Sequence, residues 1–101
     1  MKVAARAFQA LADPTRRQIL QDLKEGEMSA GEIVARFSIS APAISRHLSI
    51  LEAADLVSGR REGNRIYYQL EAENLASVLG DFLSAVCPTQ IIQRRARKRK
   101  V

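Results

Sequence analysis

The sequence is poor in the side chains that bind metals or form disulfides. It contains one cysteine, Cys87, and one histidine, His47, among its 101 residues. One thiol cannot pair within the chain, and these two ligands cannot complete a four-ligand zinc site within one protomer. We therefore expect a protein with no metal site and no cofactor.

Targeting and membrane-spanning segments are missing as well. No apolar run approaches the ~20 residues that a membrane span needs. The N-terminus lacks the charged segment, apolar segment and small-residue cleavage site of a secretory signal. A lone cysteine also agrees with a reducing compartment. These features predict a cytoplasmic protein without a membrane span.

The sequence lacks catalytic motifs too. It contains no Gly-rich phosphate-binding loop. Its carboxylates occur mostly where helix caps or solvated helix faces are expected. His47 falls about 60° from the core-facing stripe of its predicted helix, which favours a hydrogen-bonded structural role over catalysis. The sequence therefore argues against an enzyme.

Positive charge is concentrated at the C-terminus. Arginine and lysine together number 16 and aspartate and glutamate 11, which gives a formal net charge of +5. Six of the basic residues lie between positions 94 and 100, and the rest of the chain holds ten basic and eleven acidic residues. The high pI therefore says little about the folded part. We predict one domain over residues 1–88 and a basic, disordered tail over residues 89–101.

Two short helices are predicted in the middle of the chain. The first begins with a capping box, in which Ser29 and Glu32 satisfy each other's backbone N–H groups. The second begins at Ser40, with Pro42 in the first turn, where its missing N–H costs nothing. We expect this second helix over residues 41–54. Its core-facing stripe consists of Ile44, Leu48 and Leu51.

The opposite face of the second helix is small and polar and carries one guanidinium. Its members are Pro42, Arg46 and Ser49, with Ala43 and Ser45 beside them. A helix that enters the DNA major groove needs short hydroxyls and an arginine that can bind guanine in bidentate fashion. An ordinary solvated helix face is the alternative, and the helix alone favours neither.

A β-hairpin is predicted directly after this helix. The runs 56–62 and 65–70 flank Gly63-Asn64, which is a two-residue turn signal. The hairpin tip carries Arg60, Arg61 and Arg65, with Glu62 as the only acidic neighbour. A cationic loop at this distance from the helix can straddle a phosphate backbone, so the hairpin favours nucleic-acid binding.

Apolar helices are predicted at both ends of the domain. The first covers residues 1–12, and Asp13-Pro14 then starts the next helix. The last begins near Ala72 and ends before Pro88. It carries more large apolar residues than a surface helix needs, namely Leu75, Val78, Leu79, Phe82, Leu83 and Val86. One small domain cannot readily cover two apolar terminal helices, so we expect a dimer rather than packing within one subunit.

Three separated motifs, in this order, resemble the ArsR-type winged helix-turn-helix repressors. They are Ala12-Asp13-Pro14-Thr15-Arg16-Arg17-x-Ile19-Leu20, Ser40-x-Pro42-Ala43-Ile44-Ser45-Arg46-His47-Leu48-x-x-Leu51 and Leu56-Val57-x-x-Arg60-x-Glu62-Gly63-x-x-x-Tyr67-Tyr68-x-Leu70. The resemblance covers roughly residues 5–86. It implies a mainly α (α+β) winged helix-turn-helix of four helices, two strands and a last helix, dimeric through the terminal helices. It also implies a homodimeric repressor of its own or a neighbouring operon, which binds an inverted repeat in double-stranded DNA in the prokaryotic cytosol or nucleoid.

The resemblance assigns three groups of contacts. The recognition helix is expected to meet bases and nearby phosphates through Ser40, Ala41, Pro42, Ser45 and Arg46. The hairpin, or wing, is expected to grip the DNA backbone or minor groove through Arg60, Arg61 and Arg65. The dimer interface is expected to contain Phe8, Leu75, Leu79, Phe82 and Val86. Metal-sensing members are described with cysteines on the third helix or with histidines and carboxylates on the last, and this chain departs from both patterns.

Several alternatives stay open at this stage. A winged-helix module can bind a protein or an RNA partner instead of DNA. Cys87 is either an apolar filler at a helix end or a redox-sensitive thiol. The basic tail is either merely solvated or adds non-specific affinity for DNA. The resemblance leaves the inducer open between a small molecule and a protein partner.

Overall fold

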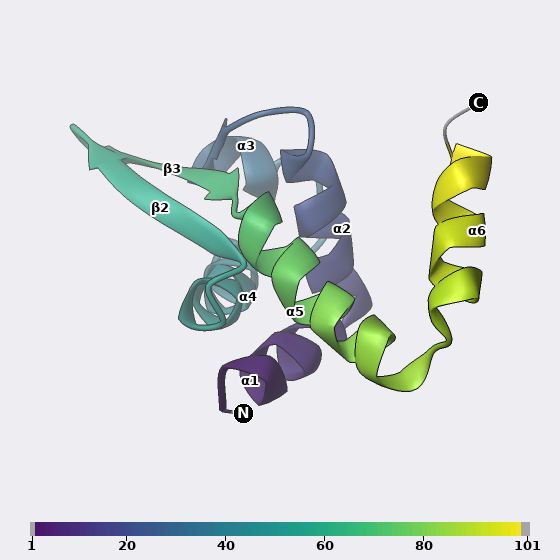
Figure 1. Cartoon of the computed structure of the whole chain (residues 1–101). Coiled ribbons are helices and arrows are strands. Elements are labelled where there is room, and N and C mark those ends of the chain that lie inside the picture. The colour runs from purple at the N-terminus through teal and green to yellow at the C-terminus, as the bar shows by residue number, and fades with distance from the viewer. Residues whose placement is uncertain (1, 100–101) are drawn as a thin grey trace.

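The computed structural model describes residues 2–99, and the side chains of residues 5–95. The element order is α1 (Lys2–Leu11), α2 (Pro14–Leu23), β1 (Met28–Ser29), α3 (Ala30–Val34), α4 (Ala41–Ala53), β2 (Val57–Glu62), β3 (Arg65–Leu70), α5 (Ala72–Val86) and α6 (Thr89–Arg99). Helices α1 to α5 form one body, and the β2–β3 hairpin projects from its side (Figure 1). The predicted order of four helices, a hairpin and a last helix is confirmed, and the structure adds β1 and α6.

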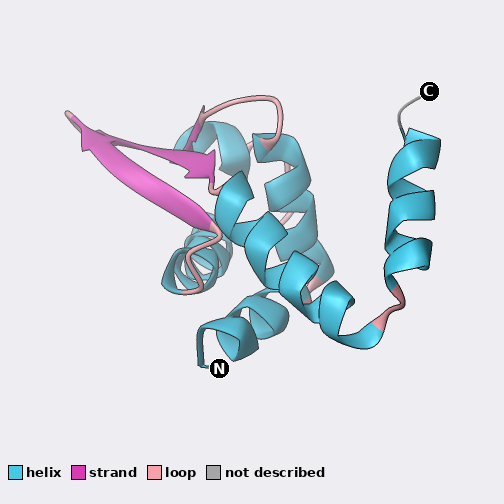
Figure 2. Cartoon of the chain, in the orientation of Figure 1, coloured by secondary structure: helices cyan, strands magenta, loops and turns pink. Residues whose placement is uncertain are grey.

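The strands form one antiparallel sheet at the edge of the helical body (Figure 2). The order is β1-β3-β2, with Met28 of β1 opposite Tyr68 of β3. In the hairpin, Glu62 lies opposite Arg65, so Gly63-Asn64 is the two-residue turn that the sequence predicts. Gly63 has φ +63°, a backbone conformation that glycine adopts without a steric penalty. The turn therefore fixes the register of the wing.

The predicted helix starts are confirmed. The Glu32 N–H donates to the Ser29 hydroxyl at 3.1 Å, and the Ser29 N–H donates to the Glu32 carboxylate at 2.7 Å. The Ser40 hydroxyl accepts from the Ala43 N–H at 3.2 Å, and the Asp13 carboxylate caps α2. Each cap satisfies backbone donors that a helix leaves without partners in its first turn.

Helix α4 ends in a tight turn that leads into the wing. Asp55 has φ +60°, and its N–H donates to the Glu52 carbonyl. The Leu56 N–H reaches back to the Leu51 carbonyl at 3.0 Å, which gives the hydrogen-bond pair of a Schellman motif. The Asn74 side chain donates to the Asp55 carbonyl at 3.0 Å, so the start of α5 holds the same turn.

The core lies between α1 to α4 and the base of the hairpin. Its largest fully buried side chains are Ile19, Ile33, Ile44, Leu48, Leu51, Leu56 and Val57. The predicted inward stripe of α4 is therefore confirmed. Helix α5, whose side chains are all described, buries none completely, and only Leu75 and Val78 pack against the core from it.

The C-terminal segment differs from the sequence prediction. The sequence predicts a disordered tail over residues 89–101, but Thr89–Arg99 form α6. The segment consists largely of Gln, Arg, Lys and Ala, which have high helix propensity, and its basic residues occur in the second half of the helix, toward the negative end of the helix dipole. Helix α6 follows the end of α5 and stands apart from the rest of the body (Figure 1). Among the described helices, none combines the length and apolarity needed to cross a bilayer.

The buried stripe of α4 yields a stability prediction. Ile44 is completely buried, so Ile44→Ala should lower the free energy of unfolding by about 2–5 kcal/mol, through weaker apolar packing and a residual cavity. Ile39, in the turn before α4, is 40% exposed, and Ile39→Ala should cost less than about 1 kcal/mol. Urea unfolding at one fixed protein concentration measures both. Equal losses would mean that α4 is not held by this stripe.

Candidate nucleic-acid interface

The outer face of α4 is open to solvent. The predicted contact residues Ser40, Ala41, Pro42, Ser45 and Arg46 are all exposed. Within the described part of the chain, the Arg46 guanidinium forms no hydrogen bond or ion pair. Ile44 and Leu48 hold the opposite side of the helix in the core, so this face is unobstructed. Its residues are small or polar. Its shape and its free guanidinium suit insertion into a DNA groove.

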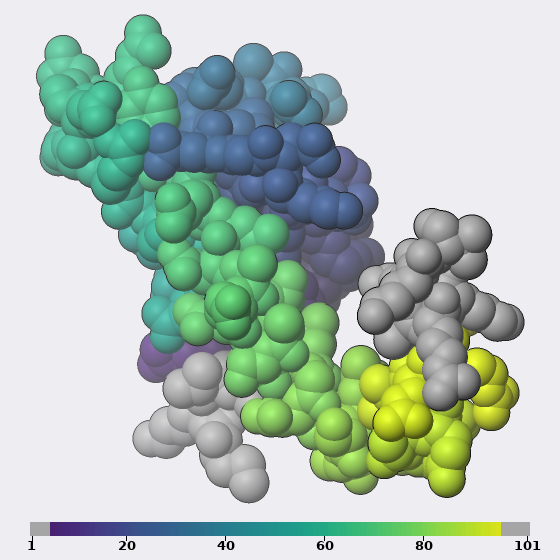
Figure 3. Space-filling view, turned by 45° about the horizontal axis from the view of Figure 1, so that its top comes forward, coloured from purple at the N-terminus to yellow at the C-terminus, as the bar shows by residue number. Residues whose placement is uncertain are grey.

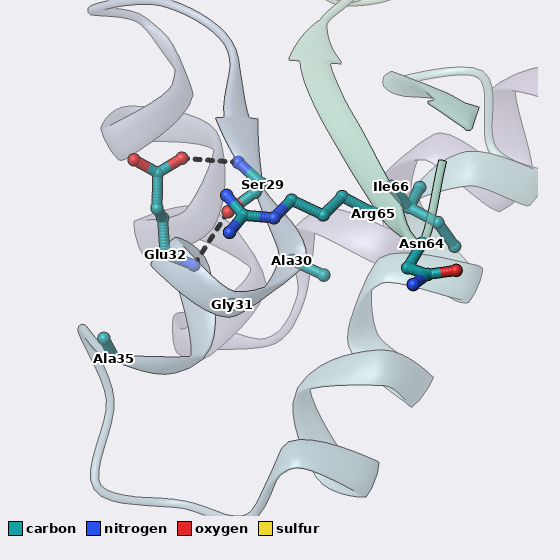
Figure 4. A pocket seen from close by; sticks show the side chains of 8 residues that line it. All are labelled: Ser29, Ala30, Gly31, Glu32, Ala35, Asn64, Arg65 and Ile66. Carbon is teal, nitrogen blue, oxygen red and sulfur yellow. Dashed lines mark hydrogen bonds between the residues drawn. The ribbon is translucent and has the colours of Figure 1, made fainter. Parts of the chain in front are cut away.

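A groove borders this face. Helix α3, the first turns of α4 and strand β3 enclose a space of about 380 Å³, floored by buried Ile44, Leu48 and Tyr68. A second hollow of about 580 Å³ continues from it along α3 and the wing (Figure 4). The outer face of α4 and the wing therefore flank one concave side of the molecule.

Arg65 crosses the second hollow. Its side chain extends from β3 toward Ser29 and Glu32 at the start of α3 (Figure 4). Hydrogen bonds from the Ser29 backbone and hydroxyl lower the pKa of the Glu32 carboxyl, and the nearby Arg65 charge lowers it further. Arg65 is exposed and forms no ion pair within the described residues, so its charge stays available to an anion.

Arg60 is more constrained than the sequence suggests. Its Nη2 and Nε donate to the two Glu27 oxygens at 2.7 and 3.1 Å, and its Nη1 donates to Glu62. The guanidinium also lies 5.0 Å from the centre of the Tyr67 ring. The bonds to Glu27, then those to Glu62, raise the pKa of Arg60. The expectation that Glu62 is the only acidic neighbour is wrong, because the turn between α2 and β1 brings Glu27 to the wing.

Arg61 lies on the other face of the hairpin from Arg60. Successive strand residues point to opposite faces, and Arg61 pairs across the sheet with Ile66. Gly59 shares this face of the hairpin, which is turned toward α4. A Cβ at Gly59 would lie only 3.4 Å from the Glu52 side chain of that helix. Arg61 is exposed and has no ion pair among the described side chains. The three predicted wing arginines therefore divide into Arg60, which is held by carboxylates, and Arg61 and Arg65, which are not.

His47 lies on the inner side of α4, where it meets Arg16 of α2. The Nη1 of Arg16 is 3.2 Å from Nδ1 of His47. His47 thus has a hydrogen-bonding partner, in agreement with the structural role that the sequence predicts for it. The sequence does not identify Arg16 as its partner, because no local spacing links two residues 31 positions apart.

The terminal helices bring two of the predicted interface residues together. The rings of Phe8 in α1 and Phe82 in α5 meet edge to face, with centroids 5.1 Å apart. Leu75 and Leu79 are half-buried, whereas Phe82 is 50% and Val86 63% exposed. Helix α5 lies along the surface, from the centre of Figure 3 to α6 at lower right. This apolar face is only partly covered within one protomer.

The usual metal-binding side chains do not gather in the described part of the chain. Among the described side chains, no three His, Cys, Asp or Glu residues lie close enough together to hold an ion. Helix α3 contains no cysteine, and Cys87 is a half-buried free thiol at the end of α5. A zinc or related ion takes four such ligands in a closed site, so the donor set of this protomer does not fit one.

Comparisons with known proteins agree with one another. Residues 13–58 match the family described as "Bacterial regulatory protein, arsR family". The chain is 46% identical over 79 residues to the transcriptional repressor SdpR of Bacillus subtilis, a match that covers 78% of this chain and 88% of SdpR. It is 45% identical to the HTH-type transcriptional regulator Rv2034 of Mycobacterium tuberculosis, over 75% of this chain and 71% of that protein. The crystal structure of NolR from Sinorhizobium fredii matches with a TM-score of 0.67 and 35% identity, over 84% of this chain and 85% of NolR.

Proposed function

Because this chain belongs to the ArsR family of bacterial transcriptional regulators, we propose that it is a homodimeric repressor that binds an inverted repeat in DNA near the promoter of its own or a neighbouring operon. Members of this family regulate transcription by binding DNA, and the chain is not an enzyme. The observation that carries the proposal is the exposed outer face of α4 with Arg46, flanked by the arginines of the wing. The site of action is the bacterial cytosol, at the nucleoid.

Helix α4 acts as the recognition helix. Arg46 is the side chain on its outer face that can bind guanine in bidentate fashion. Ser45 and the capping residue Ser40 offer hydroxyls to base edges or phosphates, and Ala41 and Pro42 are small enough to let the helix approach the groove. Base reading is therefore assigned to Arg46 and positioning to its polar neighbours.

The wing contacts the phosphate backbone or the minor groove beside this helix. Arg61 and Arg65 carry charges that no described carboxylate neutralises through an ion pair, so they are assigned the direct contacts. Arg60 belongs to the same surface, but its guanidinium has to leave Glu27 to reach a phosphate. Its first role is to hold the hairpin against the domain.

The dimer forms through α1 and α5. The apolar side chains left open on α5, above all Phe82 and Val86, need a cover, and a second copy of α5 supplies one with a two-fold axis. Phe8 extends the same surface from α1. A two-fold dimer presents two recognition helices to two half-sites about 34–36 Å apart, one turn of the duplex. An inverted repeat is the DNA sequence with the matching symmetry.

Arg46 provides the first test. Arg46→Ala should weaken binding to the duplex selected from a random library by about 1–3 kcal/mol, because the variant cannot form the bidentate bond to a base. The fold should be unchanged, since the side chain is exposed. Fluorescence anisotropy at one salt concentration measures binding to the selected duplex and to a scrambled one. Equal losses on both duplexes would assign Arg46 to phosphate contact only, and no loss on either would remove it from the interface.

The wing arginines differ in their expected salt dependence. Replacing both Arg61 and Arg65 by Ala should flatten the plot of log K against log salt by about 0.9 for each phosphate that is no longer neutralised. Arg60→Ala should change the slope less, because Glu27 and Glu62 already neutralise that guanidinium. A salt titration of duplex binding compares the three proteins. An unchanged slope in the double variant would exclude the wing from the interface.

The dimer interface is tested by charge insertion on α5. Leu79→Glu, Phe82→Glu or Val86→Glu should place an unpaired charge in the interface, at a cost well above the ~1 kcal/mol of a typical substitution. Val86 is 63% exposed in the protomer, so its change should not unfold the subunit. Ser77→Glu, on the opposite side of the helix, is the control and should stay dimeric. Sedimentation velocity gives the oligomeric state, and a Val86→Glu protein that remains a dimer with full DNA affinity would refute this interface.

A further inference from the structure

Arg16 connects three helices through one guanidinium. Its Nε donates to the Ala10 carbonyl at 2.7 Å, and its Nη2 donates to the Gln9 carbonyl at 3.0 Å. Both acceptors lie in the last turn of α1, where carbonyls have no partners within the helix. The remaining nitrogen, Nη1, lies 3.2 Å from Nδ1 of His47 in α4. One side chain of α2 thus joins the end of α1 to the recognition helix.

The direction of the bond to His47 follows from the chemistry of the two groups. A guanidinium has only donors, so a hydrogen bond at this contact requires Nδ1 of His47 to accept, which is the role of Nδ1 in the tautomer that carries its proton on Nε2. The nearest Asp13 oxygen is 3.9 Å from Nδ1, which is too far for a hydrogen bond, and it already accepts from the Arg16 backbone N–H. The His47 side chain is only 19% exposed, so the bond is largely shielded from water.

Helices α1 and α4 are joined by apolar packing, with Ala7 and Ala10 buried in the same core cluster as the α4 stripe, and by hydrogen bonds. Ile44 and Leu48 hold α4 in the core, but the hydrophobic effect that drives their burial is non-directional. The planar fork of Arg16 is directional, because its donors point along fixed lines to acceptors in both helices. This hydrogen-bonded bridge therefore adds a directional constraint to the apolar contact between α1 and α4.

We propose that Arg16 and His47 are positioning residues that set the half-site spacing read by the dimer. The inference rests on the proposed function, in which α1 and α5 form the dimer and α4 enters the major groove. Phe8 packs α1 against α5, so the Arg16 bridge extends the connection from the dimer surface to the recognition helix. When the bridge is lost, a small rotation of α4 relative to α1 is expected in both subunits. Such a rotation changes the separation of the two recognition helices.

Arg17 provides a matched control. Its Nη1 donates to the Leu11 carbonyl at 2.7 Å, so it also caps the end of α1. Within the described side chains it makes no contact with α4 that corresponds to the bond between Arg16 and His47. A change at Arg17 therefore removes a bond to α1 without breaking the bridge.

The experiment measures spacing preference rather than affinity alone. A set of duplexes carries the selected half-sites with the centre-to-centre distance changed by one base pair at a time, and each step turns one half-site by roughly a tenth of a helical turn. Binding of the full-length protein is measured for Arg16→Lys, His47→Leu, His47→Asn and Arg17→Lys. Sedimentation and thermal unfolding verify that each variant is a folded dimer. A monomeric or unfolded Arg16→Lys protein would give the bridge a stabilising role and overturn the proposal. The same result for Arg17→Lys would show that the arginine bonds to the end of α1, rather than the bridge to α4, hold the dimer, and would overturn it too.

The variants should separate into two groups. Arg16→Lys and His47→Leu should reduce the preference for the best spacing by about fivefold or more, and the double variant should be no worse than either, because both break one bond. His47→Asn should keep the preference, because the amide oxygen stands where Nδ1 stood and can accept from Arg16. Arg17→Lys should also keep it.

Each contrary outcome has a distinct meaning. If Arg16→Lys and His47→Leu lose affinity equally at every spacing, or if His47→Asn behaves like His47→Leu, the two residues only stabilise the fold and the positioning proposal fails. If the unmodified protein binds the selected half-sites without preferring any spacing, the proposed dimeric operator binding fails instead.

Discussion

The burial of one side of α4 is the constraint on which the rest of the structure depends. Ile44, Leu48 and Leu51 are fixed in the core, and this leaves only the opposite side of the helix for contact with another molecule. The caps at both ends of α4 complete the arrangement, because Ser40 fixes where the helix begins and the turn at Asp55 directs the chain into the wing. One buried stripe thus positions both the exposed face of α4 and the hairpin beside it.

The features that could be predicted from the sequence are those determined by neighbours along the chain. The capping box at Ser29, the N-cap at Ser40 and the turn at Gly63 each depend on contacts within a few residues, and all agree with the structure. The exposed face of α4 follows from helical periodicity in the same way. The composition of the exposed face of α4 could therefore be predicted from the sequence.

The features that the sequence did not reveal depend on tertiary contacts. Glu27 meets Arg60 across 33 positions, and Arg16 meets His47 across 31 positions, so no local spacing signals either pair. The two-residue strand β1 exists only because β3 is available to pair with it. The helix at residues 89–99 escapes prediction for another reason, since a run of basic residues is typical of solvated chain although its helix propensity is high.

The pair between Arg60 and Glu27 has a consequence for the thermodynamics of recognition. A hairpin that projects from a domain has freedom to swing, and that freedom is lost when the hairpin contacts a partner. The bond from Arg60 to the turn between α2 and β1 removes much of this motion while the protein is still free. The entropy of ordering the wing is then lost on folding rather than on association. In the proposed complex, the wing arginines would reach the duplex already arranged.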